Sequence, residues 1–284
     1  MLEAEQYSEA KELLEFLLQC QGEDQRHYEE WGNLLSWLNM AFPSEGKGSS
    51  GQGHLGEAEE EDETAFRAEA LNPREQDDAY INQVLYIMQH HPMIDQQMLA
   101  LERASYITSK DIDSTIIHWL TNEQVHPVVQ FKALQCLRKR GATGSLTLDR
   151  LGESVQVEIE RTPLSMDDFP PPINRIVERV ERVAEVHDPT LPHFARELWK
   201  ESLQFLYGTS AYTWMLRDDE ETVDCYSAAL HLSLMLTVYG KAEDDELRDT
   251  YGITESLRFR YEQASRTLRQ VASMQQDYPD EPQS

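Results

Sequence analysis

Two segments of the chain repeat one arrangement of apolar residues, and this repeat constrains the fold more than any other feature. Pro92 and Pro127 are 35 positions apart, and each lies between two runs in which apolar residues recur every three to four positions. The positions that match at this offset are Ile81 and Ile116, Val84 and Trp119, Leu85 and Leu120, and Leu99 and Leu134. Two amphipathic helices per unit, repeated in tandem, are typical of stacked α-helical repeats. We expect each proline to open the second helix of its unit, because its missing N–H would be unpaired there.

The histidines beside these prolines raise the question of a metal or catalytic site. His90, His91 and His126 stand immediately before the expected helix starts, in turn positions. A metal site would require ligands four residues apart on a helix, or a cluster of Cys, His and carboxylates, and neither pattern occurs. His118 and His231 lie inside helical runs, where we expect packed, hydrogen-bonded rings. We therefore interpret all five as structural and expect no metal and no cofactor.

The amino-terminal segment predicts a separate helical hairpin followed by a linker. Two amphipathic runs fall within residues 1–42, with their apolar positions at Ala10, Leu13, Leu14, Leu17 and Leu18 and at Trp31, Leu34, Leu35 and Leu38. Residues 43–74 begin with Gly and Ser and turn acidic from Glu57 to Glu63. Such a composition cannot bury enough apolar surface to offset the entropy of ordering. We expect residues 43–74 to be a disordered linker.

The rest of the chain predicts three further regions and a tail. Residues 75–142 carry the helical repeats. Residues 143–172 change to a period of two around Leu151-Gly152, which indicates a β-hairpin, and continue into a proline-rich connector. The three consecutive prolines before Ile173 lead us to expect no helix before that residue. We expect a helical domain over residues 173–275 and a disordered tail over residues 276–284.

Within the carboxyl-terminal domain, apolar spacing predicts several helices. The residues expected on apolar helix faces are Ile173, Ile176, Val177, Val180 and Val183 in one helix and Phe194, Leu198, Trp199, Leu203 and Leu206 in the next. The run from Val223 to Tyr239 is apolar on most faces, so we expect it to be the buried central helix of this domain. Tyr226, Leu230, Leu234 and Met235 are expected in its core.

Charge and cysteine content limit the classes of partner. Asp and Glu number 52 against 25 Lys and Arg, which gives a formal net charge of −27. This excess repels phosphate backbones and anionic lipids, so we expect neither nucleic acid nor a membrane as partner. The three cysteines, Cys20, Cys136 and Cys225, have no disulfide or metal spacing and are expected to pack as small apolar residues. With an acidic start and no long apolar run, we expect a cytoplasmic protein.

One segment supports a different function. Residues 244–270 predict a short helix, a turn at Gly252 and a second helix, an arrangement that resembles a degenerate helix-turn-helix. The second helix carries four arginines against Glu255 and Glu262, and nucleic acid would contact it between Thr254 and Gln270, through Arg258 and Arg260 above all. The four arginines are Arg258, Arg260, Arg266 and Arg269. No further basic stripe supplies additional phosphate contacts. We therefore keep a nucleic-acid regulator as the alternative hypothesis.

Residues 75–275 resemble an uncharacterised bacterial family of tetratricopeptide-repeat and HEAT-like helical repeat proteins. The resemblance is carried by "KALQCLRKRGATGSLTLDRLGESVQVEIERTP" and "DPTLPHFARELWKESLQFLYG", and "HPVVQFKALQCLRKRG" is similar to the second helix of a HEAT-type repeat. It implies a helical repeat scaffold with an appended domain and transfers no catalytic residue.

The combined expectation is a mainly α-helical protein. It comprises helical-hairpin repeats, one small β-hairpin and a carboxyl-terminal helical domain. No phosphate loop, serine elbow, paired metal carboxylates or Cys-His arrangement occurs in the sequence. The leading hypothesis is a non-catalytic scaffold that binds a protein partner, whose identity and binding surface the sequence does not specify, and whose oligomeric state it leaves open.

Overall fold

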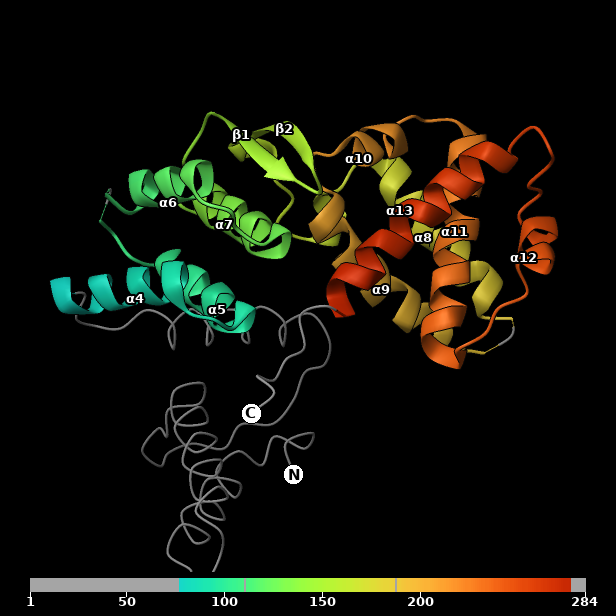
Figure 1. Ribbon diagram of the computed structural model, residues 1–284, viewed down its shortest axis with the longest axis horizontal. Helices are drawn as coiled ribbons and strands as arrows, with labels where there is room; N and C mark the ends of the chain where they lie inside the picture. Colours follow the sequence, from blue (N-terminus) through green and yellow to red (C-terminus); the bar gives the residue numbers. More distant parts are fainter. Residues whose placement is uncertain (1–76, 110, 187, 277–284) are drawn as a thin grey trace, which may run out of the picture. The chain divides into compact units, whose positions relative to one another are not determined.

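The computed structural model describes residues 77–109, 111–186 and 188–276 (Figure 1). The chain divides into two compact units, residues 1–81 and 82–284, and the first contributes only the start of helix α4 to the described part. The expected hairpin over residues 1–42, the linker over residues 43–74 and the tail beyond Gln276 lie outside the described residues.

The described part is mainly helical with one small antiparallel sheet, which confirms the coarse fold expected from the sequence. The helices of the first half are α4 (Asp78–His90), α5 (Ile94–Ala104), α6 (Asp111–Asn122) and α7 (Pro127–Lys139). Strands β1 (Ser145–Arg150) and β2 (Glu153–Glu158) follow, with the short 3-10 helices η2 (Ile159–Arg161) and η3 (Met166–Asp168). The remaining helices are α8 (Pro171–Ala184), α9 (Leu191–Leu206), α10 (Ser210–Met215), α11 (Glu220–Tyr239), α12 (Asp244–Thr250) and α13 (Arg258–Gln276).

Helices α5, α6 and α7 pack together through the apolar faces that the sequence pattern indicated, with α7 in contact with both others. Pro127 is the first residue of α7, as expected. The corresponding expectation for Pro92 is wrong, because α5 begins at Ile94 after the N-cap residue Met93. Pro92 lies in the bend that precedes this cap, where its fixed φ is equally acceptable.

Arg140, at the end of α7, holds this helix group together. Its guanidinium donates to the carbonyl oxygens of Ala104 at 2.8 Å, of Ser109 at 2.6 Å and of Ile107, all at the end of α5 or just after it. The same side chain forms an ion pair with Asp113 in the first turn of α6. One buried cation therefore satisfies the carbonyls that a helix end leaves without partners.

The β-hairpin has the turn that the sequence indicated. Leu151 and Gly152 both have positive φ values, 51° and 80°, as a tight two-residue hairpin turn requires. Leu148 pairs with Val155, and their side chains lie on the buried face. In Figure 1 the hairpin lies between the helices of the first half and those of the second.

The connector after the hairpin differs from the expectation in one respect. Helix α8 begins at Pro171, two residues before the expected start at Ile173, with Pro170 as its N-cap. Proline is tolerated in the first turn because the N–H groups there have no helical acceptor.

Helix α11 is the centre of the carboxyl-terminal region, where it contacts α8, α9, α10, α12 and α13. Trp199 of α9 is fully buried beside it and donates from Nε1 to the Ile173 carbonyl at 3.1 Å. Two expectations are wrong in detail: Phe194 is 48% exposed, and the last turn of α11 leaves the core. There the exposed fractions are 41% for Leu236, 39% for Val238 and 45% for Tyr239.

Candidate interaction groove

The two histidines that precede prolines perform the same local task. The Nδ1 atom of His91 accepts a hydrogen bond from the Met93 N–H at 3.1 Å, and that of His126 accepts one from the Val128 N–H at 3.3 Å. Each imidazole thus supplies an acceptor to an N–H group near a helix start; His126 is the N-cap residue of α7, whereas His91 bonds to the N–H of Met93, the N-cap residue of α5. Both rings sit where the sequence pattern placed them, in the turns before α5 and α7.

His126 also borders a buried polar cluster that the sequence did not indicate. Arg150, at the end of β1, is fully buried and donates to Gln130 Oε1 and to the Phe205 carbonyl, each at 3.2 Å, and to the Gln204 carbonyl. Burial lowers the pKa of Arg150 to about 10. Burial, followed by the positive charge of Arg150, lowers the pKa of His126 to about 4. At neutral pH this cluster therefore carries its positive charge on Arg150 alone.

The remaining titratable groups singled out from the sequence have different surroundings. His231 is buried and lies 2.9 Å through Nδ1 from the Tyr251 hydroxyl, as expected for a packed ring. His118 is exposed on α6, so the expectation that it packs inside is wrong. Cys136 and Cys225 are buried free thiols, and burial raises the pKa of both, to about 11 for Cys225.

The arginines of the helix-turn-helix hypothesis are paired with carboxylates of the protein itself. Arg258 forms ion pairs with Glu255 at 3.4 Å and Glu262 at 3.0 Å, and Arg260 with Glu221 at 2.9 Å. Helix α13 begins at Arg258, so the expectation that Glu255 belongs to this helix is wrong, because Glu255 lies in the turn before it. A nucleic acid would have to displace these carboxylates to reach either guanidinium.

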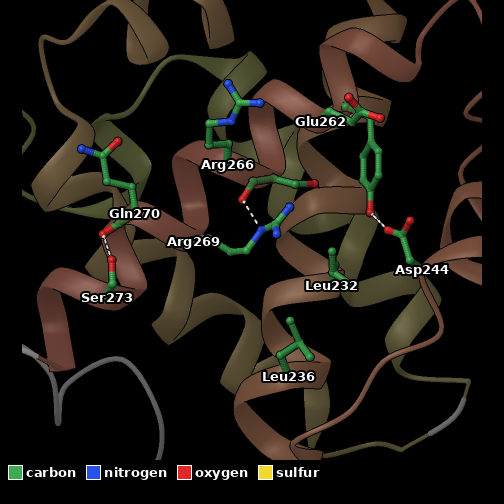
Figure 2. Close-up of a pocket in the computed structure, with 10 residues that line it drawn as sticks. Leu232, Leu236, Asp244, Glu262, Arg266, Arg269, Gln270 and Ser273 are labelled. Atoms are coloured by element: carbon green, nitrogen blue, oxygen red, sulfur yellow. Dashed lines mark hydrogen bonds between the residues drawn. The ribbon is translucent and has the colours of Figure 1, made fainter.

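An open groove lies between the second half of α11 and α13. We call it the α11–α13 groove; its volume is about 870 Å³. Leu232 and Leu236 of α11 line one side of it, and Tyr261, Arg266 and Arg269 of α13 line the other (Figure 2). Leu236 belongs to the exposed end of α11, so the groove joins an apolar surface to a polar wall.

In the α11–α13 groove, the carboxylates have partners within the chain, whereas the arginines form no ion pair among the described residues. Asp244 accepts a hydrogen bond from the Tyr261 hydroxyl and pairs with Arg248, while Glu262 pairs with Arg258. Both carboxylates in the groove therefore already have partners within the chain. Burial and then the bond to Asp244 raise the pKa of Tyr261, so its hydroxyl stays protonated at neutral pH.

The two arginines of the groove have no such partners. Arg269 donates from Nε to the Ser265 carbonyl at 3.2 Å in its own helix, as the dashed line in Figure 2 shows. Among the described residues neither Arg269 nor Arg266 forms an ion pair, and both side chains are exposed. Their positions three residues apart place them on one side of α13.

A second, smaller cavity of about 260 Å³ continues the surface on the other side of Leu236. It is lined by residues of α9, α11 and α13, including Leu198, Ser202 and Thr237, and it shares Leu236 and Arg269 with the larger groove. These two side chains therefore stand between two hollows, where a bound segment would contact both of them.

The sequence analysis identified the basic helix on one side of the groove, but it expected the α11 side to be buried. Arg266 and Arg269 belong to the locally basic helix that it identified, but Leu236 was assigned to a buried helix. A signal was present, because Tyr239, Gly240 and Lys241 mark an end of the helix at the surface. How many turns would leave the core depended on the lengths of α9 and α13, which pack beside α11.

Within the described ranges, no three His, Cys, Asp or Glu side chains are arranged to hold a metal ion. Nor is any helix in those ranges both long enough and apolar enough to cross a membrane. Comparisons with protein-family models, with curated proteins and with solved structures found no match to this chain.

Proposed function

We propose that this protein is a non-catalytic, cytoplasmic helical scaffold that binds another protein through the α11–α13 groove. The observation that carries the proposal is the emergence of α11 from the core beside that groove. Leu236 is 41% exposed and lines the groove together with Arg266 and Arg269, which form no ion pair among the described residues. Val238 and Tyr239, in the same last turn of α11, are exposed to a similar degree outside the groove lining. Apolar side chains exposed together beside unsatisfied charges are characteristic of surfaces that bind proteins.

The state of the buried titratable groups supports a non-catalytic role. Acid–base catalysis is most effective when the pKa of the catalytic group lies near the working pH. The pKa of His126 is lowered to about 4, and burial raises those of Tyr251 and Cys225. His126 caps a helix and His231 contacts Tyr251, so the two rings serve structural contacts. The free thiols of Cys136 and Cys225 are compatible with a reducing compartment.

We propose also that α4–α5 and α6–α7 are two HEAT-like repeats, in keeping with the resemblance to helical repeat proteins. The second helices of the two pairs, α5 and α7, contact each other. Contact between equivalent helices of successive units is what stacking of repeats produces. In this arrangement the repeats support the carboxyl-terminal region through the contact of α7 with α9.

Site-specific cross-linking tests the scaffold proposal. A photo-reactive amino acid at Leu236 in the full chain should give a discrete covalent adduct with one protein in extracts of the source cells. The same residue at Tyr86, which is 65% exposed on α4, serves as the matched control. The adduct from position 236 should disappear when excess unlabelled wild-type protein competes, and an excess of the Leu236→Asp variant should not remove it. Absence of any protein adduct from either position, and of any protein co-purifying with the full chain, would refute the proposed function.

A further inference from the structure

We propose that the occupant of the α11–α13 groove is an acidic amphipathic helix of a partner protein. Its carboxylates would pair with Arg266 and Arg269, and an adjacent apolar side chain would pack on Leu232 and Leu236. This inference rests on the proposed function and adds the chemistry of the partner to it.

Charge is the first argument for an acidic occupant. The chain has a formal net charge of −27, and two other arginines of this helix, Arg258 and Arg260, are paired with its carboxylates. Arg266 and Arg269 instead lack ion pairs among the described residues, while Asp244 and Glu262 in the same groove already have them. The charge that the groove can still bind is therefore negative, since a basic segment would find its carboxylates occupied.

Spacing is the second argument. Arg266 and Arg269 are separated by three residues of helix, which corresponds to a rise of about 4.5 Å. Carboxylates three or four residues apart on a facing helix have nearly the same separation, so both pairs can form at once. Leu236 is shared by the larger and the smaller cavity, so an apolar residue of the occupant can contact it beside the ion pairs. Apolar anchors combined with such pairs are the usual means by which a helix binds in a groove.

The acidic residues around the groove favour a short acidic peptide segment over a nucleic acid as its occupant. Asp245 and Glu246 follow Asp244 at the start of α12, and Glu255 lies before α13. A nucleic acid carries its charge evenly along its length, so its phosphates would meet these acids as well as the two arginines. A peptide can place carboxylates opposite Arg266 and Arg269 alone. At physiological salt the screening length is about 8 Å, which weakens repulsion from more distant acids.

Fluorescence anisotropy with designed peptides tests the inference on the full chain. The probe is a labelled peptide of about 16 residues, designed as an amphipathic helix with two glutamates three residues apart beside two leucines. A glutamine version and a lysine version of the same peptide complete the set. The wild-type protein should bind the glutamate peptide at least about fivefold more tightly than the glutamine peptide at 0.15 M salt.

Variants locate the binding. Arg266→Gln and Arg269→Gln should each weaken binding of the glutamate peptide about threefold, and Leu236→Asp about tenfold or more. Arg260→Gln on the same helix and the exposed Arg182→Gln on α8 are the matched controls, and each should change it less than twofold. The double variant Arg266→Glu with Arg269→Glu should reverse the preference and bind the lysine peptide. Circular dichroism and the melting temperature of each variant verify that it is folded.

Several results would overturn the inference. It fails if the glutamate and glutamine peptides bind equally, if neither binds, or if the controls weaken binding as much as Arg266→Gln and Arg269→Gln do. Binding of a labelled 20-base-pair DNA duplex that depends on Arg266 and Arg269 would replace it with a nucleic-acid site. If a native partner is cross-linked at position 236 but binds the Arg266→Gln and Arg269→Gln variants as tightly as the wild-type protein, the inference fails and the scaffold proposal stands.

Discussion

The turns before α5 and α7 share a His-Pro sequence and the same local hydrogen bond of the imidazole, yet their surroundings differ. In both turns the imidazole Nδ1 accepts a hydrogen bond from the N–H two residues later. His126 in addition makes an edge contact with Phe205, at 5.4 Å between ring centroids, and borders the buried Arg150 cluster. The comparison shows that four neighbouring residues are enough to specify a cap, whereas the environment of the ring depends on residues far along the chain.

The largest effect on stability is expected from removing Arg150, the buried cation beside His126 in the turn before α7. Arg150→Ala would leave a cavity and would remove the donor from Gln130 and from two carbonyls at the end of α9. We expect a loss of about 3 kcal/mol in the free energy of unfolding, measured by urea denaturation. Arg150→Met, which fills most of the space, should lose about half as much. The exposed Arg161→Ala is the control and should change stability by less than about 0.5 kcal/mol. A loss below about 1 kcal/mol for Arg150→Ala would show that the cluster is not a stabilising centre.

A second test addresses how closely the end of α9 packs against β2, near the turn before α7. Gly208, just after α9, has a φ of 81°, and an added Cβ would lie 2.7 Å from Val157 Cγ1 of β2. Gly240, just after α11, has a φ of 69° and no atom within 4 Å of an added Cβ. Gly208→Ala should therefore cost about 2 to 3 kcal/mol, the sum of backbone strain and overpacking, and Gly240→Ala about 1 kcal/mol. Equal changes in thermal stability would show that β2 moves aside without cost.

The pH dependence of stability distinguishes the two turns most directly. The His126 ring has a pKa of about 4 in the folded protein against 6.5 in an unfolded chain, so it is neutral in both states above pH 6.5. As the pH falls from 6.5 towards 4, the unfolded chain takes up a proton that the folded protein does not. Stability is thus full above pH 6.5 and falls through this window, by up to about 2 kcal/mol after a reduction for the ring's partial exposure.

The His126→Asn variant isolates this contribution, because its amide oxygen can still cap α7 without titrating. Urea denaturation at pH 7.5 and at pH 4.5 should show that the variant loses less stability on acidification than the wild-type protein. Identical losses in the two proteins would mean that His126 is protonated in the folded state.

The smallest effect is expected at the first turn. His91→Ala removes one acceptor from the exposed Met93 N–H, which water can then satisfy. The expected loss is about 0.5 kcal/mol, and about 1 to 2 kcal/mol for His126→Ala, where the ring also packs on Phe205. Thermal unfolding of both variants tests this order, and a reversed order would contradict the comparison between the two turns.

The sequence predicted more of the fold than of the candidate site. It indicated the β-hairpin with its Leu151-Gly152 turn, and the helices other than α10, with shifted starts at α5, α8 and α13. For the groove, it identified the basic character of α13 but treated the whole run from Val223 to Tyr239, which contains Leu236, as a buried helix. A helix sequence that is apolar on most faces predicts a buried helix. Its periodicity does not show how many of its turns the neighbouring helices cover.

Whether a feature could be predicted from the sequence depends on how far apart along the chain its interacting residues lie. Helical periodicity, the two histidine caps and the hairpin turn each depend on residues within a few positions of one another, so reading along the chain suffices to find them. Arg150 instead contacts residues 20, 54 and 55 positions away, and the ion pair of Arg260 with Glu221 spans 39 positions. Which arginines are buried, which are neutralised and which remain open to a partner was settled only when distant helices packed together. Coulombic pairing and desolvation depend on distances in space, and these do not follow from separation along the sequence.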